Sequence, residues 1–238
     1  MIFVIQHVGI EGIGTLGEFF GSIYKDIKTV DLERGNNLPG GFKNIEAIIV
    51  LGGPMNVYEV DKYPFLKDED FFLKAALKNN IPILGICLGA QLLAKSAGAA
   101  VKKASNSEIG WYDIFLTEDG IEDELFYGLD STLKVFQWHE DTFEVPKEGT
   151  LLAASNICRN QAFKIGTNAY GLQFHIEITE DMIKAWTGEY LDNNDAALRN
   201  KAEKMRQDYM AIKDVFDKQA RKVYLNFLKL IEGNKFKI

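Results

Sequence analysis

The segment 81–97 reads IPILGICLGAQLLAKSA and is followed by Gly98. Its beginning is a nearly continuous apolar run, which is typical of a strand buried on both faces of a parallel sheet. From Leu88 onward the segment is rich in Leu, Ala, Gln and Lys, which predicts a helix with a glycine stop. Cys87 therefore lies on a tight turn between a buried strand and a helix.

Cys87 has the setting of a nucleophile. Gly85 and Gly89 flank it and let the chain turn sharply without a Cβ clash, as in the nucleophile elbow of serine hydrolases. At the N-terminus of the predicted helix, free backbone N–H groups and the positive end of the helix dipole favour a thiolate over a thiol. A lone cysteine is more often a small apolar core residue, so the assignment needs a base as well.

A candidate base stands at the end of a second predicted strand, 169–175. His175 is its last residue, and Thr179 with two following acids marks the start of a helix. Residues two apart on a strand point the same way, so Glu177 can accept the ring N–H of His175 and fix its tautomer. Because sites of parallel sheets form at the carboxyl ends of the strands, the pattern predicts a triad of Cys87, His175 and Glu177.

Four blocks of sequence carry a family resemblance. They are LGGPM at 51–55, GICLGAQ at 85–91, QFHIE at 173–177 and, more loosely, QWHED at 137–141. In order and spacing the chain resembles the class I glutamine amidotransferases, and most closely free-standing proteins related to the amidotransferase domain of GMP synthase. It departs from the family at Ile176, where proline is usual, and an extended isoleucine is expected to leave the triad intact.

The resemblance implies a chemistry for these residues. Cys87 is expected to attack the side-chain amide of glutamine and give a γ-glutamyl thioester and ammonia, with His175 as base and Glu177 as its orienting partner. The backbone N–H groups of Gly53 and Leu88 are expected to hold the oxyanion. Without the resemblance, the glycine pair before Pro54 is an ordinary turn.

The resemblance also places three residues near the substrate. Gln91, one helical turn after the cysteine, is expected to hold the amino-acid end of glutamine, and His139 and Asp141 are expected to lie in a loop beside the glutamyl pocket. Without the resemblance, Gln91 would be interpreted as a helix-forming residue, and His139 and Asp141 as polar residues at the end of a strand. No cofactor and no metal are expected, because the histidine spacing of hydrolytic zinc enzymes is lacking.

The composition agrees with a soluble, cytoplasmic enzyme, and the resemblance implies a small-molecule substrate. The chain has 238 residues, 47% of them apolar, which suffices for one α/β domain. The N-terminal MIFVI is expected to be a strand rather than a signal peptide, and two cysteines give no disulfide framework. A net charge of −7 argues against nucleic-acid or membrane partners.

The order of elements predicts a single-domain, doubly wound, mostly parallel α/β sheet. The resemblance implies that this sheet is of the flavodoxin-like, class I amidotransferase type. The first half alternates strands near 2–8, 28–32, 46–51 and 81–86 with helices near 15–25, 66–79 and 88–97. Additional antiparallel strands are expected near 111–117, 134–138, 150–155, 161–166 and 169–175, and helices near 179–191 and 198–232. Residues 1–192 are expected to form the amidotransferase domain and 193–238 a helical extension packed on it.

A competing motif lies at 12–17, GIGTLG, which matches the dinucleotide-binding fingerprint after a strand. Residues 9–11 separate it from the strand, however, and Thr15 with Glu18 has the pattern of a capping box at an ordinary helix start. A nicotinamide or flavin enzyme is therefore the lesser alternative.

The fate of the released nitrogen stays open. The second half has no Gly-rich phosphate loop, so an ammonia acceptor is expected on a separate synthase chain. The alternative is a stand-alone γ-glutamyl peptidase or hydrolase that releases another amine, and a catalytically idle regulatory module is a third possibility.

Overall fold

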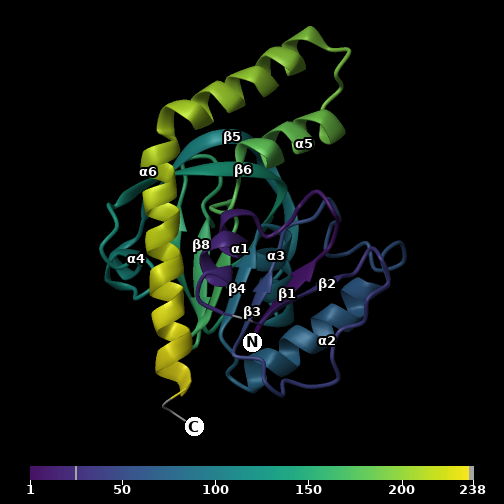
Figure 1. Ribbon diagram of the computed structural model, residues 1–238, viewed down its shortest axis with the longest axis vertical. Helices are drawn as coiled ribbons and strands as arrows, with labels where there is room; N and C mark the ends of the chain where they lie inside the picture. Colours follow the sequence, from purple (N-terminus) through teal and green to yellow (C-terminus); the bar gives the residue numbers. More distant parts are fainter. Residues whose placement is uncertain (25, 236–238) are drawn as a thin grey trace.

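The computed structural model describes residues 1–24 and 26–235, and within them the strands form one sheet in the order β2-β1-β3-β4-β9-β8-β7-β5-β6 (Figure 1). The first five of these strands are parallel: β1 (Ile2–Gln6), β2 (Ile27–Asp31), β3 (Ala47–Val50), β4 (Ile83–Ile86) and β9 (Ala169–Leu172). The remaining four are antiparallel: β5 (Val101–Leu116), β6 (Thr132–Phe143), β7 (Gly149–Ala154) and β8 (Ala162–Ile165).

The side chains of β1 alternate between two hydrophobic cores. Ile2 and Val4 pack with α1 (Gly14–Gly21) and the C-terminal half of α6 (Ala196–Lys235) on one face of the sheet. Phe3 and Ile5 pack with α2 (Phe65–Lys78) and α3 (Leu88–Ser96) on the other. This alternation follows from the two-residue period of a strand. The prediction of a doubly wound α/β sheet extended by antiparallel strands is confirmed.

The antiparallel pair β5 and β6 is longer than the sequence predicted. Strand β5 begins at Val101 rather than near 111, and β6 runs to Phe143, with a register shift between Lys103 and Glu108. Residues 101–108 are mostly polar and partly exposed, so they lack an alternating apolar pattern. Pairing with β6 keeps them extended. Residues 139–141 lie within β6, so the prediction that they form a loop is wrong.

The helix after β9 and the first part of α6 cover the end of the sheet that carries β5 and β6, and the rest of α6 runs along one face of the sheet (Figure 1). Helix α5 (Glu180–Tyr190) starts as predicted, with Thr179 accepting a hydrogen bond from the Met182 N–H. Helix α6 bends, and its first part packs against Trp111 and Trp186 through Met205 and other apolar residues. The short α4 (Glu118–Glu122) was not predicted. Among the described residues, no helix combines the length and apolarity needed to span a membrane.

The start of α1 differs from the predicted capping box. Ile13 occupies the N-cap without a side-chain hydrogen bond, and the Thr15 hydroxyl bonds the Tyr224 hydroxyl instead. The Thr15 N–H donates to the carbonyl oxygen of Glu177 at 3.0 Å, and a Cβ on Gly14 would come within 2.1 Å of that oxygen. Gly14 thus allows close backbone packing. A pyrophosphate would need the helix N-terminus that this carbonyl fills.

Candidate active site

Cys87 lies on a strained turn between β4 and α3. Its backbone has φ 52° and ψ −107°, a conformation that costs energy for any residue except glycine. A Cβ on Gly89 would come within 2.2 Å of the Val50 carbonyl oxygen, and one on Gly85 within 2.6 Å of the Gly89 oxygen. The two glycines therefore let α3 pack directly on the sheet. As predicted, this turn holds the Cys87 side chain at the carboxyl edge of the parallel strands.

His175 follows β9 and reaches the same edge. The predicted strand end is wrong, because β9 stops at Leu172 and His175 forms an isolated antiparallel bridge with Phe136, its N–H lying 2.8 Å from the Phe136 oxygen. The ring of Trp186 packs edge-on against the imidazole, with ring centroids 4.8 Å apart. Contacts from β6 and α5 thus orient the ring.

The His175 ring pairs with Glu177 and lies close enough to Cys87 to interact with it. The Cys87 thiol also donates to the Trp138 carbonyl oxygen at 3.7 Å. Nδ1 lies 2.7 Å from Glu177 Oε1, and the two side chains are 1% and 2% exposed. Burial disfavours the imidazolium, but the charges and hydrogen bonds of Glu177 and Cys87 outweigh it and raise the pKa of His175 well above its ordinary value of 6.5. The sequence prediction that these three side chains come together agrees with this geometry.

Two glycines follow β3 and approach the cysteine closely. A Cβ on Gly52 would lie 3.1 Å from His175 Cε1 and 3.7 Å from Cys87 Cβ, and one on Gly53 would lie 2.9 Å from Leu88 Cδ2. Only residues without a side chain leave the backbone accessible here. Leu88 is the first residue of α3, so its N–H has no partner within the helix.

A cavity of about 310 Å³ opens beside the Cys87 thiol. Of the residues that the sequence singled out, Gly53, Cys87, Leu88, Gln91, His139, Asp141 and His175 line it. Glu177 lies behind His175. Further lining residues from loops, from β5 and β6 and from α5 were not predicted, among them Glu11, Asn56, Lys103, Trp138, Trp186 and Tyr190.

Gln91 and Asp141 meet on the floor of the cavity. The Gln91 amide nitrogen donates to the Asp141 backbone oxygen at 3.3 Å and to Gln173 Oε1 at 3.2 Å. The Asp141 carboxylate is buried, and neither oxygen has a partner at normal hydrogen-bond geometry among the described residues. Lys103 Nζ lies 3.7 Å from Asp141 Oδ1. Burial and the nearby Asp141 charge raise the pKa of Tyr58, so Lys103 and Tyr58 both face this carboxylate. Neither is within normal hydrogen-bond geometry of it, and a cationic ligand would complete the compensation of the buried charge.

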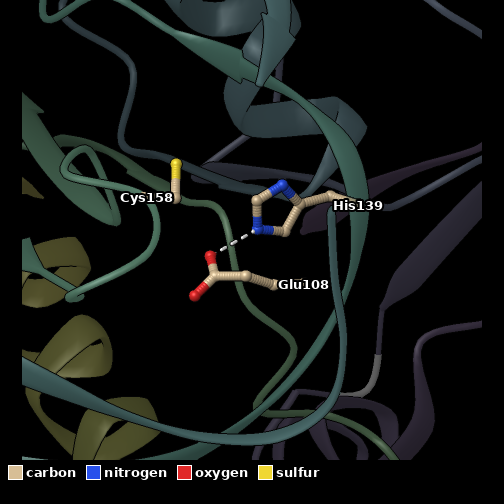
Figure 2. A group of neighbouring side chains, drawn as sticks. All are labelled: Glu108, His139 and Cys158. Carbon is tan, nitrogen blue, oxygen red and sulfur yellow. Dashed lines mark hydrogen bonds and ion pairs between the residues drawn. The ribbon is translucent and has the colours of Figure 1, made fainter. Parts of the chain in front are cut away.

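His139 is held by its neighbours (Figure 2). Its Nδ1 lies 2.9 Å from the Asp141 backbone oxygen, and its Nε2 lies 3.0 Å from Glu108 Oε2. Glu108 is buried and also accepts hydrogen bonds from Ser155 at 2.8 Å and Gln161 at 2.6 Å. Both ring nitrogens are therefore engaged within the protein, and the imidazole stiffens the wall of the cavity.

Glu108, His139 and Cys158 are also the candidates for holding a metal ion. Their ligand atoms lie within 4.8 Å of one another (Figure 2). Burial raises the pKa of the Cys158 thiol, whose sulfur lies 3.1 Å from the Thr142 hydroxyl. A metal ion would need the thiolate and would break the bond between His139 and Glu108. The bond between His139 and Glu108 and the contact of Cys158 with Thr142 account for the cluster.

Glu11 is a buried acid that the sequence did not predict. It lines the cavity and accepts a hydrogen bond from the Tyr190 hydroxyl at 2.9 Å. Burial raises the pKa of Glu11, and the neighbouring His175 opposes this shift. The residue lies in the loop after β1, where no sequence signal marks its approach to the base.

Solved structures of glutamine amidotransferases share this fold. A crystal structure of one from Thermotoga maritima matches 97% of both chains with a TM-score of 0.86 and 34% identity. A second, from Methylobacillus flagellatus, matches 96% of this chain and 94% of its own with a TM-score of 0.84 and 25% identity.

Sequence comparisons identify the same kind of relative. A GMP synthase (glutamine-hydrolyzing) subunit of Sulfolobus acidocaldarius is 34% identical over 169 residues, which cover 68% of this chain and 85% of that protein. The glutamine amidotransferase-like protein YfeJ of Salmonella typhimurium is 33% identical over 153 residues, 63% of this chain and 64% of YfeJ, so less than two thirds of that relative is spanned. A family model, Glutamine amidotransferase class-I, matches residues 23–185. The chain belongs to the class I glutamine amidotransferase family.

Proposed function

We propose that the protein hydrolyses the γ-amide of glutamine, or of a γ-glutamyl compound, through a cysteinyl thioester. The observation that carries the proposal is the placement of Cys87, on its strained turn, against the imidazole of His175, which is paired with the buried Glu177. A nucleophile, a base and an orienting carboxylate in this arrangement are what acyl transfer requires.

The raised pKa of His175 supports an imidazolium beside Cys87, and in the proposed reaction Cys87 acts as the thiolate. The Cys87 sulfur attacks the γ-carbonyl carbon, and the carbonyl electron pair moves to oxygen. The imidazolium then gives its proton to the leaving nitrogen as the carbon–nitrogen bond breaks, which leaves the γ-glutamyl thioester. In the second half, water attacks the thioester while His175 takes its proton, and glutamate leaves with return of the thiolate.

The developing oxyanion is assigned to the backbone N–H groups of Gly53 and Leu88. Both residues line the cavity beside Cys87, and the Leu88 N–H belongs to the first turn of α3. Loss of one such donor typically lowers kcat about a hundred- to a thousandfold.

The amino-acid end of the substrate is assigned to Gln91 and Asp141. The buried Asp141 carboxylate is suited to an α-ammonium group, and Gln91 ties the Asp141 backbone to Gln173 beside Cys87, whose sulfur lies 3.8 Å from the Gln173 amide nitrogen. His139 supports this wall from behind through Glu108.

The Sulfolobus relative is named as one subunit of a glutamine-hydrolysing GMP synthase, which supports ammonia transfer to a separate synthase chain. We also assign residues 1–192 to the amidotransferase domain and 193–238 to a helical extension, since the family match lies within the first segment.

The second candidate function is that of a stand-alone hydrolase that releases a larger amine. It is favoured by the partly exposed Ile109, Trp138 and Tyr190, which line the cavity and offer apolar surface to a leaving group.

The test is to measure release of ammonia from glutamine and of free amine from a panel of γ-glutamyl amides, with Cys87→Ser as the inactive control and Cys158→Ser as the matched active one. Mass spectrometry of the quenched reaction should show a γ-glutamyl adduct on Cys87. Release of ammonia supports the first candidate, and release of larger amines alone selects the second. Unchanged turnover in Cys87→Ser eliminates the mechanism.

A further inference from the structure

A third buried histidine–acid pair, His7 and Glu69, lies beneath the predicted oxyanion hole. His7 follows β1, and its ring is fully buried, as is Glu69 of α2. His7 Nε2 lies 2.9 Å from Glu69 Oε2, and His7 Nδ1 lies 3.0 Å from the Gly52 carbonyl oxygen. Both ring nitrogens thus face acceptors. Burial opposes a charged ring, yet Glu69 and the Gly52 carbonyl raise the pKa of His7 above 6.5, so the imidazolium can donate to both.

The bond from His7 to Gly52 sets the direction of the next N–H. The described residues contain no cis peptide bond, so the Gly52 carbonyl and the Gly53 N–H belong to one planar trans unit and point in opposite directions. The carbonyl is turned toward His7, which is buried and does not line the cavity, whereas Gly53 does. The Gly53 N–H therefore points toward the cavity.

The Gly53 N–H is also available. No acceptor among residues 1–24 and 26–235 takes a hydrogen bond from it, and Gly53 is only partly buried where it lines the cavity. A donor that is left open beside Cys87 is suited to an oxygen of the substrate.

The same peptide would rotate easily without a restraint. It joins two glycines, which have no Cβ to restrict φ and ψ. Rotation by half a turn would aim the Gly52 carbonyl oxygen into the cavity, where it would repel a developing oxyanion. The hydrogen bond from His7 opposes this rotation, and Glu69 orients the ring that donates it.

We propose that His7, oriented by Glu69, is a positioning residue that holds the Gly52–Gly53 peptide with its N–H toward the reacting carbonyl, so that the oxyanion hole is formed in the free chain. The catalytic role of this peptide rests on the proposed function, because the peptide can stabilise an oxyanion only if the proposed reaction takes place. The peptide orientation itself can be tested without any activity.

Two variants at one position separate the two hydrogen bonds. In His7→Asn, the side-chain amide nitrogen can occupy the place of Nδ1 and still donate to Gly52, but it cannot reach Glu69. In His7→Gln, the longer side chain can occupy the place of Nε2 and donate to Glu69, but it loses Gly52. Both variants remain polar, and thermal unfolding of each checks that it folds.

The expected result is a kcat about a hundredfold lower in His7→Gln with little change in KM, and recovery of most of kcat in His7→Asn. Alkylation of Cys87 by iodoacetamide should keep its rate in both variants, since that reaction uses no oxyanion hole. If His7 served only the stability of the core, the activities would follow the melting temperatures, and the Asn variant would show no recovery.

Crystal structures of the free wild type and of His7→Gln give the second measurement. The Gly52 carbonyl should face His7 in the wild type and should turn toward the cavity, wholly or in part, in the variant. An unchanged peptide in His7→Gln overturns the inference, whatever its activity. A wild type that turns over no γ-glutamyl substrate refutes the proposed function alone, and the peptide orientation is still decided by the two structures.

Discussion

Replacement of Glu177 by glutamine tests how the carboxylate acts on His175. The glutamine side chain has the same shape, and its amide oxygen can still accept the Nδ1–H that Glu177 Oε1 accepts at 2.7 Å. The ring orientation and tautomer are therefore kept, and only the negative charge is removed. Because both side chains are almost completely buried, little solvent screens that charge in the wild type.

The size of the effect follows from the burial of the pair. A hydrogen bond to a charged group contributes about 1.5–3 kcal/mol and one between neutral groups about 0.5–1.5 kcal/mol, so loss of the charge alone costs about 1–1.5 kcal/mol. Because about 1.4 kcal/mol corresponds to a tenfold change in rate, we expect kcat/KM to fall roughly five- to tenfold in Glu177→Gln. The charge of Glu177 also helps to raise the pKa of His175, so its removal lowers that pKa. Since His175 must be protonated to give its proton to the leaving nitrogen, the alkaline limb of the pH–rate profile should move to lower pH.

The assay is the pH dependence of kcat/KM on the best γ-glutamyl substrate. Glu118→Gln makes the same chemical change at an exposed position in α4 and is the control. An activity within about threefold of wild type, together with an unmoved alkaline limb, would show that the charge of Glu177 is not used, because even the smaller estimate predicts about a fivefold loss.

Three further outcomes are expected. Iodoacetamide should label Cys87 faster than Cys158, because Cys87 lines the cavity and burial raises the pKa of Cys158; equal rates in peptide mapping would argue against an activated thiol. Asp141→Asn should raise the KM for glutamine about tenfold or more with a smaller change in kcat, since it removes the charge assigned to the α-ammonium; an unchanged KM places that group elsewhere. The folded-state pKa of His7 lies above 6.5, so its contribution to stability is complete below that pH and is lost as the pH rises through the folded-state value. Urea unfolding should therefore show a steeper decline in stability above pH 6.5 for wild type than for His7→Asn, and parallel curves would contradict this.

Elements with a local cause could be predicted from the sequence alone. Gly85 and Gly89 around Cys87 demanded a sharp turn, and the apolar runs of β1, β3 and β4 could be satisfied only by burial on both faces of a sheet. Cys87, His175 and Glu177 could be predicted because each stands at or near the end of a strand pattern, and parallel strands end at one edge.

Contacts that join distant segments became visible only in the folded chain. His7 and Glu69 are 62 residues apart, and Gln91 and Asp141 are 50 apart. Each residue alone has the pattern of an ordinary helix or strand position. The length of β5 was likewise set by its partner β6 rather than by its own polar sequence. Side-chain periodicity indicates which face of a helix or strand is buried. It does not indicate which residue of a distant segment lies opposite that face, because this is determined only when the layers of the fold pack together.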